Sequence, residues 1–296
     1  MLKASPPYSL RKTLSCGQAF RWRWDGEAAS GVFAGRSVRL VQGTGRIRVQ
    51  GLADARDLEA LGRYLGINEP LAEIEEALRS DRIIRRILPH TSGIALMRQD
   101  PWECMISFIV SAFNNIPKIE LTLDRLSRRF GTRQEGGWMF PSAVRLASAT
   151  RRELRLCLLG YRAPYVAAVA RQIARRDVDL AALAELSYDD ARRRLLALPG
   201  VGDKVADCLL LFAYGKGEAF PVDIWVKRAV ERWYFGGQRK TERQIRTFAR
   251  DRFGALAGYA QQHLYYYIRE RGTGNGERRK TPDANALSRS GRLRGR

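Results

Sequence analysis

The stretch LLALPGVGDKVADCLLLF, residues 195–212, decides the fold of this chain. Its apolar residues recur three and four apart, which predicts one helix that ends at Leu198 and a second that begins near Asp203. Pro199 and Gly200 stop the first helix, because proline cannot continue it and glycine accepts the left-handed backbone of a helix end. The stretch therefore predicts two helices joined by a tight turn.

The turn consists of Gly200, Val201 and Gly202. Backbone N–H groups in this turn and at the start of the second helix have no partner within the helices, so they suit a phosphate oxygen. Two helices around such a turn form the helix-hairpin-helix pattern, predicted here over residues 189–214, which holds a DNA backbone without reading bases. A hairpin whose glycines only allow tight packing is the simpler alternative.

Lys204 follows in the first turn of the second helix, where the positive end of the helix dipole disfavours another positive charge. A neutral amine is a nucleophile, whereas an ammonium group is not. For an isolated lysine at this place, a phosphate contact is the alternative role. Cys208 comes one turn later on the same helix face, where its small side chain could form the wall of a flat pocket or simply pack in the core.

A second candidate lies in PVDIWVKRAVERWYF, residues 221–235, which places Asp223 as the N-cap of a helix beginning at Ile224. A carboxylate that accepts helix N–H bonds stays ionised and fixed in direction. It could therefore stabilise a sugar of oxocarbenium character, as glycosidic bond cleavage requires. Helix capping alone is the simpler explanation for an isolated aspartate.

The composition points to a polyanionic partner. The 296 residues include 52 Lys and Arg against 31 Asp and Glu, a formal net charge of +21, which favours nucleic acid through counterion release. No apolar run approaches the ~20 residues of a membrane span, and residues 1–12 lack a signal peptide, so we expect an intracellular, DNA-associated protein with no membrane partner. The four cysteines and two histidines form no ligand pattern, so we expect no metal and no other cofactor.

The hydrophobic period changes along the chain. Residues 19–51 alternate apolar and polar side chains between glycine-rich turns, which predicts a small antiparallel sheet with one covered face. A helical period then runs through residues 56–66, 71–80, 102–113, 119–131, 165–176, 188–200, 203–215, 223–237, 242–254 and 258–271.

These periods predict an α+β fold, in which a small N-terminal antiparallel β-sheet domain precedes a mostly helical helix-hairpin-helix domain. We expect the sheet domain and the helix that follows it in residues 1–66, and the helical domain in residues 67–271. Residues 272–296 carry seven basic and two acidic side chains, and we expect them to be a disordered tail that adds non-specific affinity for DNA.

The two central segments occur together, and LPGVGDKVADC with PVDIW resembles the helix-hairpin-helix plus Gly-Pro-Asp superfamily of DNA glycosylases. Three further segments, SCGQAFRWRW, RQDPWECMISFIVSAFNN and LGYRAPYVAAVA, are similar to the 8-oxoguanine DNA glycosylases. The resemblance extends from about residue 10 to about residue 270. It implies a small sheet domain joined to a helical domain, and a monomeric enzyme that acts on double-stranded DNA containing an oxidised purine.

The resemblance also implies the chemistry, because Lys204 and Asp223 occupy the positions of the family's nucleophile and aspartate. Lys204 would attack C1′ of the flipped nucleotide and form a Schiff base, after which β-elimination could nick the strand. Asp223 would stabilise the developing charge. The result would be a bifunctional DNA glycosylase and AP lyase of base excision repair.

Four residues are implied as the pocket for the damaged base. The backbone carbonyl of Gly17 would accept the N7–H that 8-oxoguanine has and guanine lacks, so guanine would set two acceptors against each other. Gln261 would bind the base edge. Cys208 and Tyr265 would form the two walls of the base sandwich, with tyrosine in place of the phenylalanine expected at the second wall.

The duplex-facing residues depart from the family pattern at three positions. Tyr161 would be the wedge that enters the vacated stack, and Arg162 would bond the orphaned cytosine. Phe113 replaces an asparagine, so the residue expected to fill the gap left by the flipped base is aromatic here. Lys118 replaces an arginine that reads the opposite cytosine, and the two changes together predict a relaxed preference for the opposite base. Trp225 replaces a histidine near the flipped nucleotide's phosphate, and its role is not predicted. The expected DNA contacts are Asn114, Asn115, Lys118, Tyr161, Arg162, Gly200, Val201, Gly202 and Trp225.

Two alternatives remain open at this point. A monofunctional alkylpurine glycosylase of the same superfamily would use the aspartate with water, and it would not need Lys204. A non-catalytic helix-hairpin-helix DNA-binding protein would use the hairpin as a clamp and the basic tail for affinity. That second alternative leaves the combination of Lys204, Asp223 and Gly17 unexplained.

Overall fold

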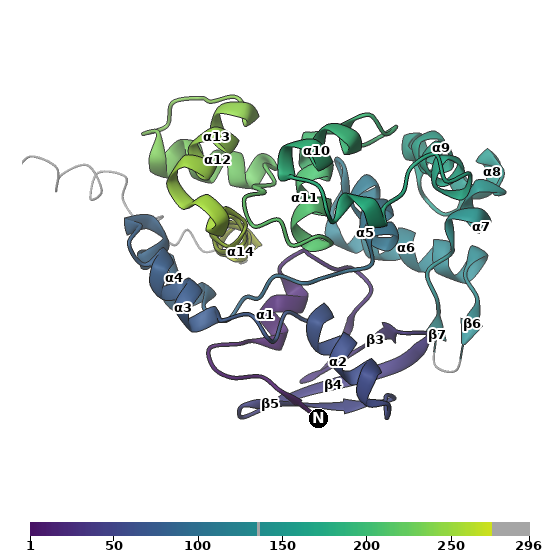
Figure 1. Cartoon of the computed structure of the whole chain (residues 1–296), viewed down its shortest axis with the longest axis horizontal. Coiled ribbons are helices and arrows are strands. Elements are labelled where there is room, and N and C mark those ends of the chain that lie inside the picture. The colour runs from purple at the N-terminus through teal and green to yellow at the C-terminus, as the bar shows by residue number, and fades with distance from the viewer. Residues whose placement is uncertain (135–136, 274–296) are drawn as a thin grey trace, which may run out of the picture.

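The computed structural model describes residues 1–134 and 137–273 of the chain. Its N-terminal part is one antiparallel sheet with the strand order β1-β5-β4-β3-β2, which lies along one side of the molecule (Figure 1). The strands are β1 (Leu2–Lys3), β2 (Arg23–Asp25), β3 (Ala28–Phe33), β4 (Arg36–Gly43) and β5 (Arg46–Gln50). β1 was not predicted, because two residues are too few to show a period.

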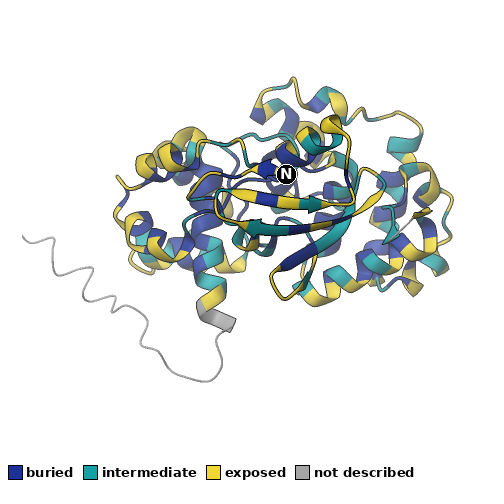
Figure 2. Cartoon of the chain, turned by 90° about the horizontal axis from the view of Figure 1, so that it is seen from below, coloured by how far each residue is buried: buried dark blue, intermediate teal, exposed yellow. Residues whose placement is uncertain are grey.

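The alternating pattern has the expected consequence for burial. Val38, Leu40 and Ile47 are fully buried on one face of the sheet, whereas Arg39 and Arg48 are exposed on the other. Figure 2 shows this mixture of buried and exposed positions along the strands as seen from below. The sheet therefore has one face in the core and one in solvent, as its period predicts.

The helix α2 (Ala55–Tyr64) covers the buried face of the sheet. The ring of Tyr64 lies 5.2 Å from that of Phe33 on β3, and its hydroxyl accepts a hydrogen bond of 2.9 Å from the indole N–H of Trp22. These aromatic contacts join the sheet to the helices above it.

The remaining elements are nearly all helical, so the predicted α+β class is confirmed. They are α1 (Leu10–Ser15), α3 (Leu71–Leu78), α4 (Arg82–Thr91), α5 (Pro101–Ser111), α6 (Ile116–Phe130), β6 (Arg133–Gln134), β7 (Gly137–Trp138), α7 (Ala143–Ala147), α8 (Arg151–Leu156), η1 (Gly160–Arg162), α9 (Ala163–Ala174), η2 (Ala181–Leu183), α10 (Tyr188–Leu196), α11 (Asp203–Phe212), α12 (Ile224–Tyr234), α13 (Glu242–Phe253), η3 (Gly254–Leu256) and α14 (Ala257–Thr273).

Four of these α-helices were not predicted. α1, α7 and α8 have five or six residues each, too few for a helical period to stand out. α4 contains Pro89, and a proline inside a segment argues against a helix there. In the structure Pro89 lies in the last turn of α4, which ends at Thr91. No described helix is both long and apolar enough to cross a membrane. Residues 274–296, which hold nearly all of the predicted tail, lie outside the described residues.

The hairpin has the predicted form with one correction. α10 ends at Leu196, two residues before the predicted Leu198, and α11 begins at Asp203 as predicted. Gly200 has φ +79°, and a Cβ there would lie 2.6 Å from the Cβ of Tyr165. The turn therefore requires glycine for its backbone and for its close packing on α9.

The helices α5 and α11 pack together at the centre of the molecule (Figure 1). The rings of Phe108 on α5 and Phe212 on α11 stack with 5.5 Å between their centroids. The C-terminal end of α5 and the N-terminal end of α11 meet through the side chains of Ser111 and Lys204, and this is where the candidate site lies.

Candidate active site

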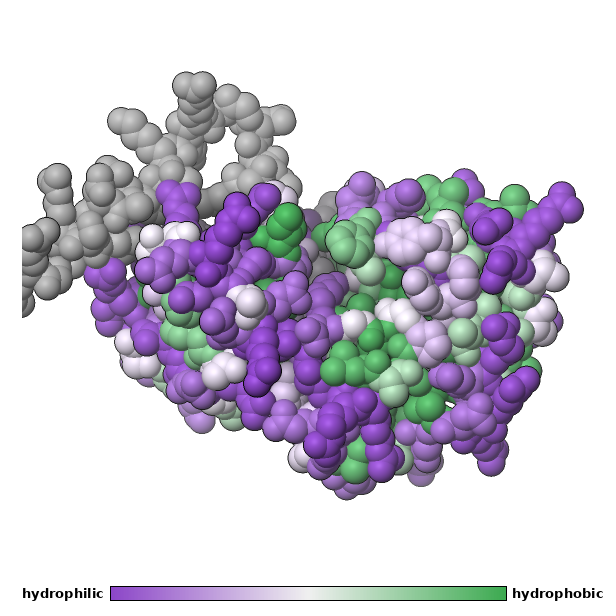
Figure 3. Space-filling model, turned by 90° about the horizontal axis from the view of Figure 1, so that it is seen from above, coloured by the Kyte–Doolittle hydropathy of each residue, from purple (hydrophilic) through white to green (hydrophobic). Residues whose placement is uncertain are grey.

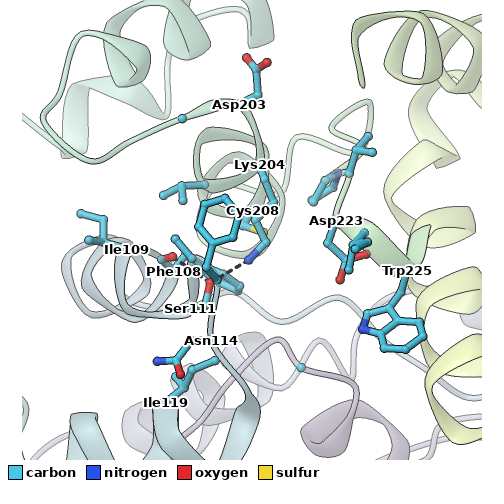
Figure 4. Close-up of a pocket in the computed structure, with 18 of the residues that line it drawn as sticks. Phe108, Ile109, Ser111, Asn114, Ile119, Asp203, Lys204, Cys208, Asp223 and Trp225 are labelled. Atoms are coloured by element: carbon cyan, nitrogen blue, oxygen red, sulfur yellow. Dashed lines mark hydrogen bonds between the residues drawn. The ribbon is translucent and has the colours of Figure 1, made fainter. Parts of the chain in front are cut away.

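Lys204 is held by the end of α5. Its Nζ donates a hydrogen bond of 2.7 Å to the hydroxyl of Ser111, and that hydroxyl donates one of 2.8 Å to the carbonyl of Phe108 (Figure 4). The same Nζ lies 4.8 Å from the centroid of the Phe108 ring. The amine is therefore fixed in direction by contacts with a helix 93 residues earlier in the chain.

Asp223 is the N-cap of α12, as predicted. Its Oδ1 accepts a hydrogen bond of 2.7 Å from the backbone N–H of Val226. Burial raises the pKa of Asp223 above its ordinary value, and the Val226 N–H and the nearby charge of Lys204 oppose this rise. The cap was expected to keep the carboxylate ionised; in the structure the bond from Val226 lowers the pKa of Asp223, but burial raises it by more.

The two candidate catalytic groups face one cavity of about 1230 Å³ from different helices. Figure 4 shows Lys204 reaching into it from α11 and Asp223 from the start of α12. None of the ion pairs among residues 1–134 and 137–273 involves Lys204. The charge of Lys204 thus opposes the rise in the pKa of Asp223, although the two groups form no ion pair. The space between them is open to a substrate.

The four residues predicted for the base pocket all line this cavity. Gly17 has φ +78°, and a Cβ there would lie 3.0 Å from the ring of Tyr265, so glycine is required where the N-terminal loop meets α14. Burial raises the pKa of Cys208 to about 12, so its thiol stays protonated and can act only as a neutral wall. Gln261 is buried, and its Oε1 accepts a bond of 2.7 Å from Gln262, which fixes its carboxamide.

The loop that carries Gly17 is fastened by its neighbour Gln18. The Gln18 side chain donates to the carbonyl of Ala95 at 2.8 Å and accepts from the N–H of Met97 at 3.0 Å. Its own carbonyl accepts from the side chain of Gln99 at 2.8 Å. A fully buried glutamine with all these bonds makes the Gly17 backbone a rigid element of the pocket.

The hairpin presents uncapped backbone donors. Gly202 is the N-cap of α11 and has no side chain to cap it, so the first N–H groups of the helix have no side-chain partner. Gly200, Val201 and Gly202 all line the mouth of the cavity. This arrangement is that of a phosphate site next to a pocket.

An ion network anchors the hairpin on both sides of Lys204. Arg192 of α10 donates to Asp203 and also to Asp207, the latter at 3.0 Å. Arg246 of α13 bonds Asp203 at 3.1 Å. Asp207 is completely buried, and burial raises its pKa to about 6 against the effect of the two arginines. The network joins α10, α11 and α13 into one unit around the lysine.

All of the predicted duplex contacts line the cavity except Lys118. Lys118, Tyr161 and Trp225 are exposed. Asn115 caps α6 through a bond from the N–H of Lys118, and Asn114 bonds the carbonyl of Val110. Arg162 and Val201, in contrast, are only 6% and 5% exposed.

Two functional contacts were missed by the sequence interpretation, namely those of Ser111 and Gln18. Both residues lie in segments that carried the family resemblance, and both are polar residues among apolar neighbours. The described residues contain no group of three or more His, Cys, Asp or Glu side chains that could hold a metal ion.

Comparisons with known proteins identify the family. Residues 2–105 match the family described as "8-oxoguanine DNA glycosylase, N-terminal domain", and residues 106–255 match "HhH-GPD superfamily base excision DNA repair protein". The chain is 33% identical over 216 residues to the "Probable N-glycosylase/DNA lyase" of Methanothermobacter thermautotrophicus, covering 65% of this chain and 69% of that protein. It is 30% identical over 278 residues to the "N-glycosylase/DNA lyase OGG1" of Arabidopsis thaliana, covering 87% and 76%.

A solved structure is similar over nearly the whole chain. It is the Clostridium acetobutylicum 8-oxoguanine glycosylase/lyase, in complex with double-stranded DNA containing cytosine opposite 8-oxoguanine. Its TM-score is 0.86 at 30% sequence identity, and the match covers 90% of this chain and 93% of that one.

Proposed function

The chain belongs to the HhH-GPD superfamily of base excision DNA repair proteins and is an N-glycosylase with DNA lyase activity, and from this premise we propose that it excises 8-oxoguanine from duplex DNA with Lys204 as the nucleophile. The observation that carries the proposal is the meeting of the Lys204 amine and the Asp223 carboxylate in one cavity, with no ion pair between them.

In the first step, the amine of Lys204 attacks C1′ of the flipped nucleotide while the bond from C1′ to the base nitrogen breaks. The base leaves with the electron pair and takes up a proton, and the amine loses one. The sugar develops positive charge in the transition state, and the carboxylate of Asp223 lies where it can stabilise that charge.

In the second step, the sugar ring opens and the C1′–N link becomes a Schiff base. Loss of a proton from C2′ then breaks the C3′–O3′ bond, which nicks the strand by β-elimination. Hydrolysis of the Schiff base frees Lys204 for another cycle. The hydrogen bond from Lys204 to Ser111 supports this role, because it holds the amine at one place when no nucleotide is bound.

Recognition of the base is proposed to rest on Gly17. Its carbonyl would accept the N7–H of 8-oxoguanine, and the rigid loop around Gln18 would keep that acceptor from moving aside for guanine. Cys208 and Tyr265 would enclose the flat faces of the base, and Gln261 would bind its edge. The neutral thiol and the aromatic ring are both suited to a planar heterocycle.

The partner is double-stranded DNA. The hairpin turn would hold one phosphate backbone through its uncapped N–H groups, and the net charge of +21 would add non-specific attraction. We propose that the protein works as a monomer on DNA in the nucleoid or nucleus.

The decisive experiment compares the wild type with Lys204→Gln on a duplex that carries one 8-oxoguanine. We expect base release and a borohydride-trapped adduct from the wild type, and a loss of both by more than about 10³-fold in the variant. Borohydride reduces only the C=N bond of a Schiff base, so trapping reports the lysine directly. Lys3→Gln removes the same charge from the exposed sheet face and should behave as the wild type.

Other outcomes would select the alternatives. Base release that survives Lys204→Gln without trapping would move the chemistry to Asp223 and water, as in a monofunctional alkylpurine glycosylase. Tight binding to the duplex with no release by either protein would indicate a non-catalytic DNA-binding protein.

A further inference from the structure

Arg269, near the end of α14, lines the cavity, and the proposed chemistry gives it no role. Its side chain is only 17% exposed. Seen from above (Figure 3), the left half of the molecule, the side on which Figure 1 places α12, α13 and α14, has a mainly hydrophilic surface. A guanidinium group that the fold encloses in this part of the molecule loses water, so the contacts that it makes instead indicate its role.

The first contact of Arg269 is with the N-terminal part of the chain. Its Nη2 donates a hydrogen bond to the carbonyl of Ser15, the last residue of α1. The carbonyl groups at the end of a helix have no donor within that helix, so a side chain from elsewhere can bind them. Ser15 precedes Gly17 by two residues. Arg269 therefore fastens the start of the loop whose carbonyl is proposed to read the damaged base.

The second contact is with Tyr265, one turn earlier on α14. The guanidinium carbon of Arg269 lies 5.6 Å from the centre of the Tyr265 ring. Burial raises the pKa of the Tyr265 hydroxyl, and the charge of Arg269 and its hydrogen bond to the hydroxyl oppose this rise. A phenylalanine, the residue expected at this wall of the pocket, could not accept that bond. The hydroxyl thus fixes the wall relative to Arg269.

The wall and the loop also touch each other directly. A Cβ at Gly17 would lie 3.0 Å from the ring edge of Tyr265 and 3.1 Å from its hydroxyl oxygen. Glycine restricts its own backbone less than any other residue, so the direction of its carbonyl depends on the groups around it. Gln18 fastens the loop on the C-terminal side through its buried side chain. Arg269 fastens it on the other side, through Ser15 and through Tyr265.

The ion pair of Arg269 does not account for its enclosed position. The carboxylate of Glu270 lies 3.5 Å from Nη2 of Arg269, but the side chain of Glu270 is 53% exposed. An ion pair with a partner in solvent contributes little to stability. The contacts of Arg269 with the pocket explain better why the guanidinium is held inside.

We propose that Arg269 is a positioning residue for base recognition, which fastens the Gly17 loop and the Tyr265 wall to each other and thereby keeps the Gly17 carbonyl directed at the N7–H of 8-oxoguanine. This inference rests on the proposed function, since it concerns the acceptor that distinguishes 8-oxoguanine from guanine. A planar guanidinium has several donors in fixed directions, so it can serve the Ser15 carbonyl and the Tyr265 hydroxyl together. Without it the Gly17 carbonyl can turn away, which weakens the bond to 8-oxoguanine and relieves the repulsion against guanine.

The test measures the dissociation constants for two duplexes that differ only in having 8-oxoguanine or guanine at one position. The variants are made in the Lys204→Gln background, which prevents excision during the measurement, and the ratio of the two constants reports discrimination. We expect Arg269→Met, which keeps the length of the side chain without its donors, to lower this ratio by about tenfold, mainly through weaker binding of the 8-oxoguanine duplex. A role in folding alone would weaken the binding of both duplexes alike and leave the ratio unchanged.

Two further variants separate the link from the charge. Arg269→Lys keeps the charge but has one amine in place of the planar guanidinium, so it should recover only a small part of the lost discrimination. Tyr265→Phe keeps the wall and removes its hydroxyl, and it should lower the ratio by about threefold. Tyr265→Phe combined with Arg269→Met should discriminate no worse than Arg269→Met alone, because the link between the two side chains is already broken.

Controls separate this inference from folding and from the proposed function. Arg243→Met removes an exposed guanidinium of α13 that does not line the cavity, and it should keep the ratio of the background. Thermal unfolding of each variant shows whether it folds, and Tyr265→Phe keeps the test valid if Arg269→Met does not fold. With Lys204 intact, Arg269→Met should be trapped by borohydride on a preformed abasic site at the wild-type rate, because that site has no base to recognise. If the wild type itself is not trapped there, the proposed function fails, whatever the binding ratio.

Two results would overturn the inference. The first is an unchanged ratio in Arg269→Met, because the Gly17 loop would then keep its direction without Arg269. The second is a loss in Arg269→Met that Arg269→Lys restores completely, because the positive charge and not the link would then carry the effect.

Discussion

We call the partly or fully buried residues Lys204, Asp223 and Cys208 the floor of the cavity, and the exposed residues beside it, such as Phe113 and Trp225, its rim. The two groups differ in how their side chains are held. On the floor, Lys204, Asp223 and Cys208 are partly or fully buried, and each has a fixed partner or a fixed place on a helix. On the rim, Phe113 and Trp225 project into solvent. The chemistry on the floor needs particular atoms at particular points, whereas stacking and phosphate contact on the rim can be supplied by several kinds of side chain. Three of the four departures from the family pattern, at Phe113, Lys118 and Trp225, are accordingly exposed residues outside the floor, and the fourth, Tyr265, keeps an aromatic ring where phenylalanine was expected.

After Lys204→Gln, the largest effect is expected from Asp223→Asn, which keeps the shape and the helix cap but removes the charge. Excision should fall by about 10²–10³-fold, because the developing positive charge on the sugar loses its carboxylate. Single-turnover kinetics on the 8-oxoguanine duplex measure this. A loss of less than about threefold would contradict the electrostatic role of the floor.

The same variant should be more stable than the wild type at neutral pH. Because burial raises the pKa of Asp223, the folded state favours the protonated form, and the carboxyl contributes stability below its unfolded pKa of about 3.9. That contribution is lost as the pH rises through the higher folded value, so the ionised group costs stability at pH 7. Thermal unfolding at pH 7 should show a higher Tm for Asp223→Asn, and a lower one would mean that the charge of Lys204 outweighs burial.

The pH dependence of excision should follow the same group. As the pH falls through the raised pKa of Asp223, the carboxylate is neutralised and excision by the wild type should decline, above the range of an ordinary aspartate. The residual excision of Asp223→Asn should lack this acid limb.

A smaller effect is expected from Ser111→Ala, which removes the partner of the Lys204 amine. Excision should slow by about tenfold, because the amine is no longer fixed in direction, while affinity for the duplex stays the same. Ser111→Thr restores the hydroxyl and should recover most of the rate. If affinity fell and the rate of the chemical step did not, Ser111 would contribute to DNA binding and not to the position of the Lys204 amine.

The smallest effect is expected on the rim, from a change of the base opposite the lesion. Phe113 and Lys118 replace the residues that are expected to favour cytosine, so excision rates opposite the four bases should agree within about threefold. Lys118→Arg should shift the rates toward cytosine, because its planar guanidinium can make paired hydrogen bonds. A strong preference of the wild type for cytosine would contradict the idea that the contacts of the rim can be supplied by several kinds of side chain.

The sequence predicted what depends on neighbouring residues. The start of α11 at Asp203 and the cap of α12 at Asp223 are confirmed, because turn and capping signals act within a few residues. The α+β class is confirmed for the same reason, since each period belongs to one element. The catalytic and DNA-binding roles of the site residues stay predictions.

What the sequence could not predict depends on packing between distant segments. The partner of Lys204 lies on another helix, and the burial of Asp223 is set by all the elements around it, so neither leaves a local pattern. The bonds of Arg162 to the carbonyls of Ala112 and Phe113 are a further example, because every residue has such a carbonyl. The end of α10 was misplaced by two residues because apolar Leu198 continues the helical period past the last helical turn.

The contact between Gly17 and Tyr265 joins the two ends of the described chain, and Arg269 donates nearby to the carbonyl of Ser15, 254 residues earlier. A chain grows from its N-terminus on the ribosome, so the loop around Gly17 emerges long before the helix that completes its wall. The proposed base pocket can exist only after nearly all of these residues have been synthesised. A product that stops before α14 lacks Gln261 and Tyr265, two of the four residues proposed to hold the damaged base.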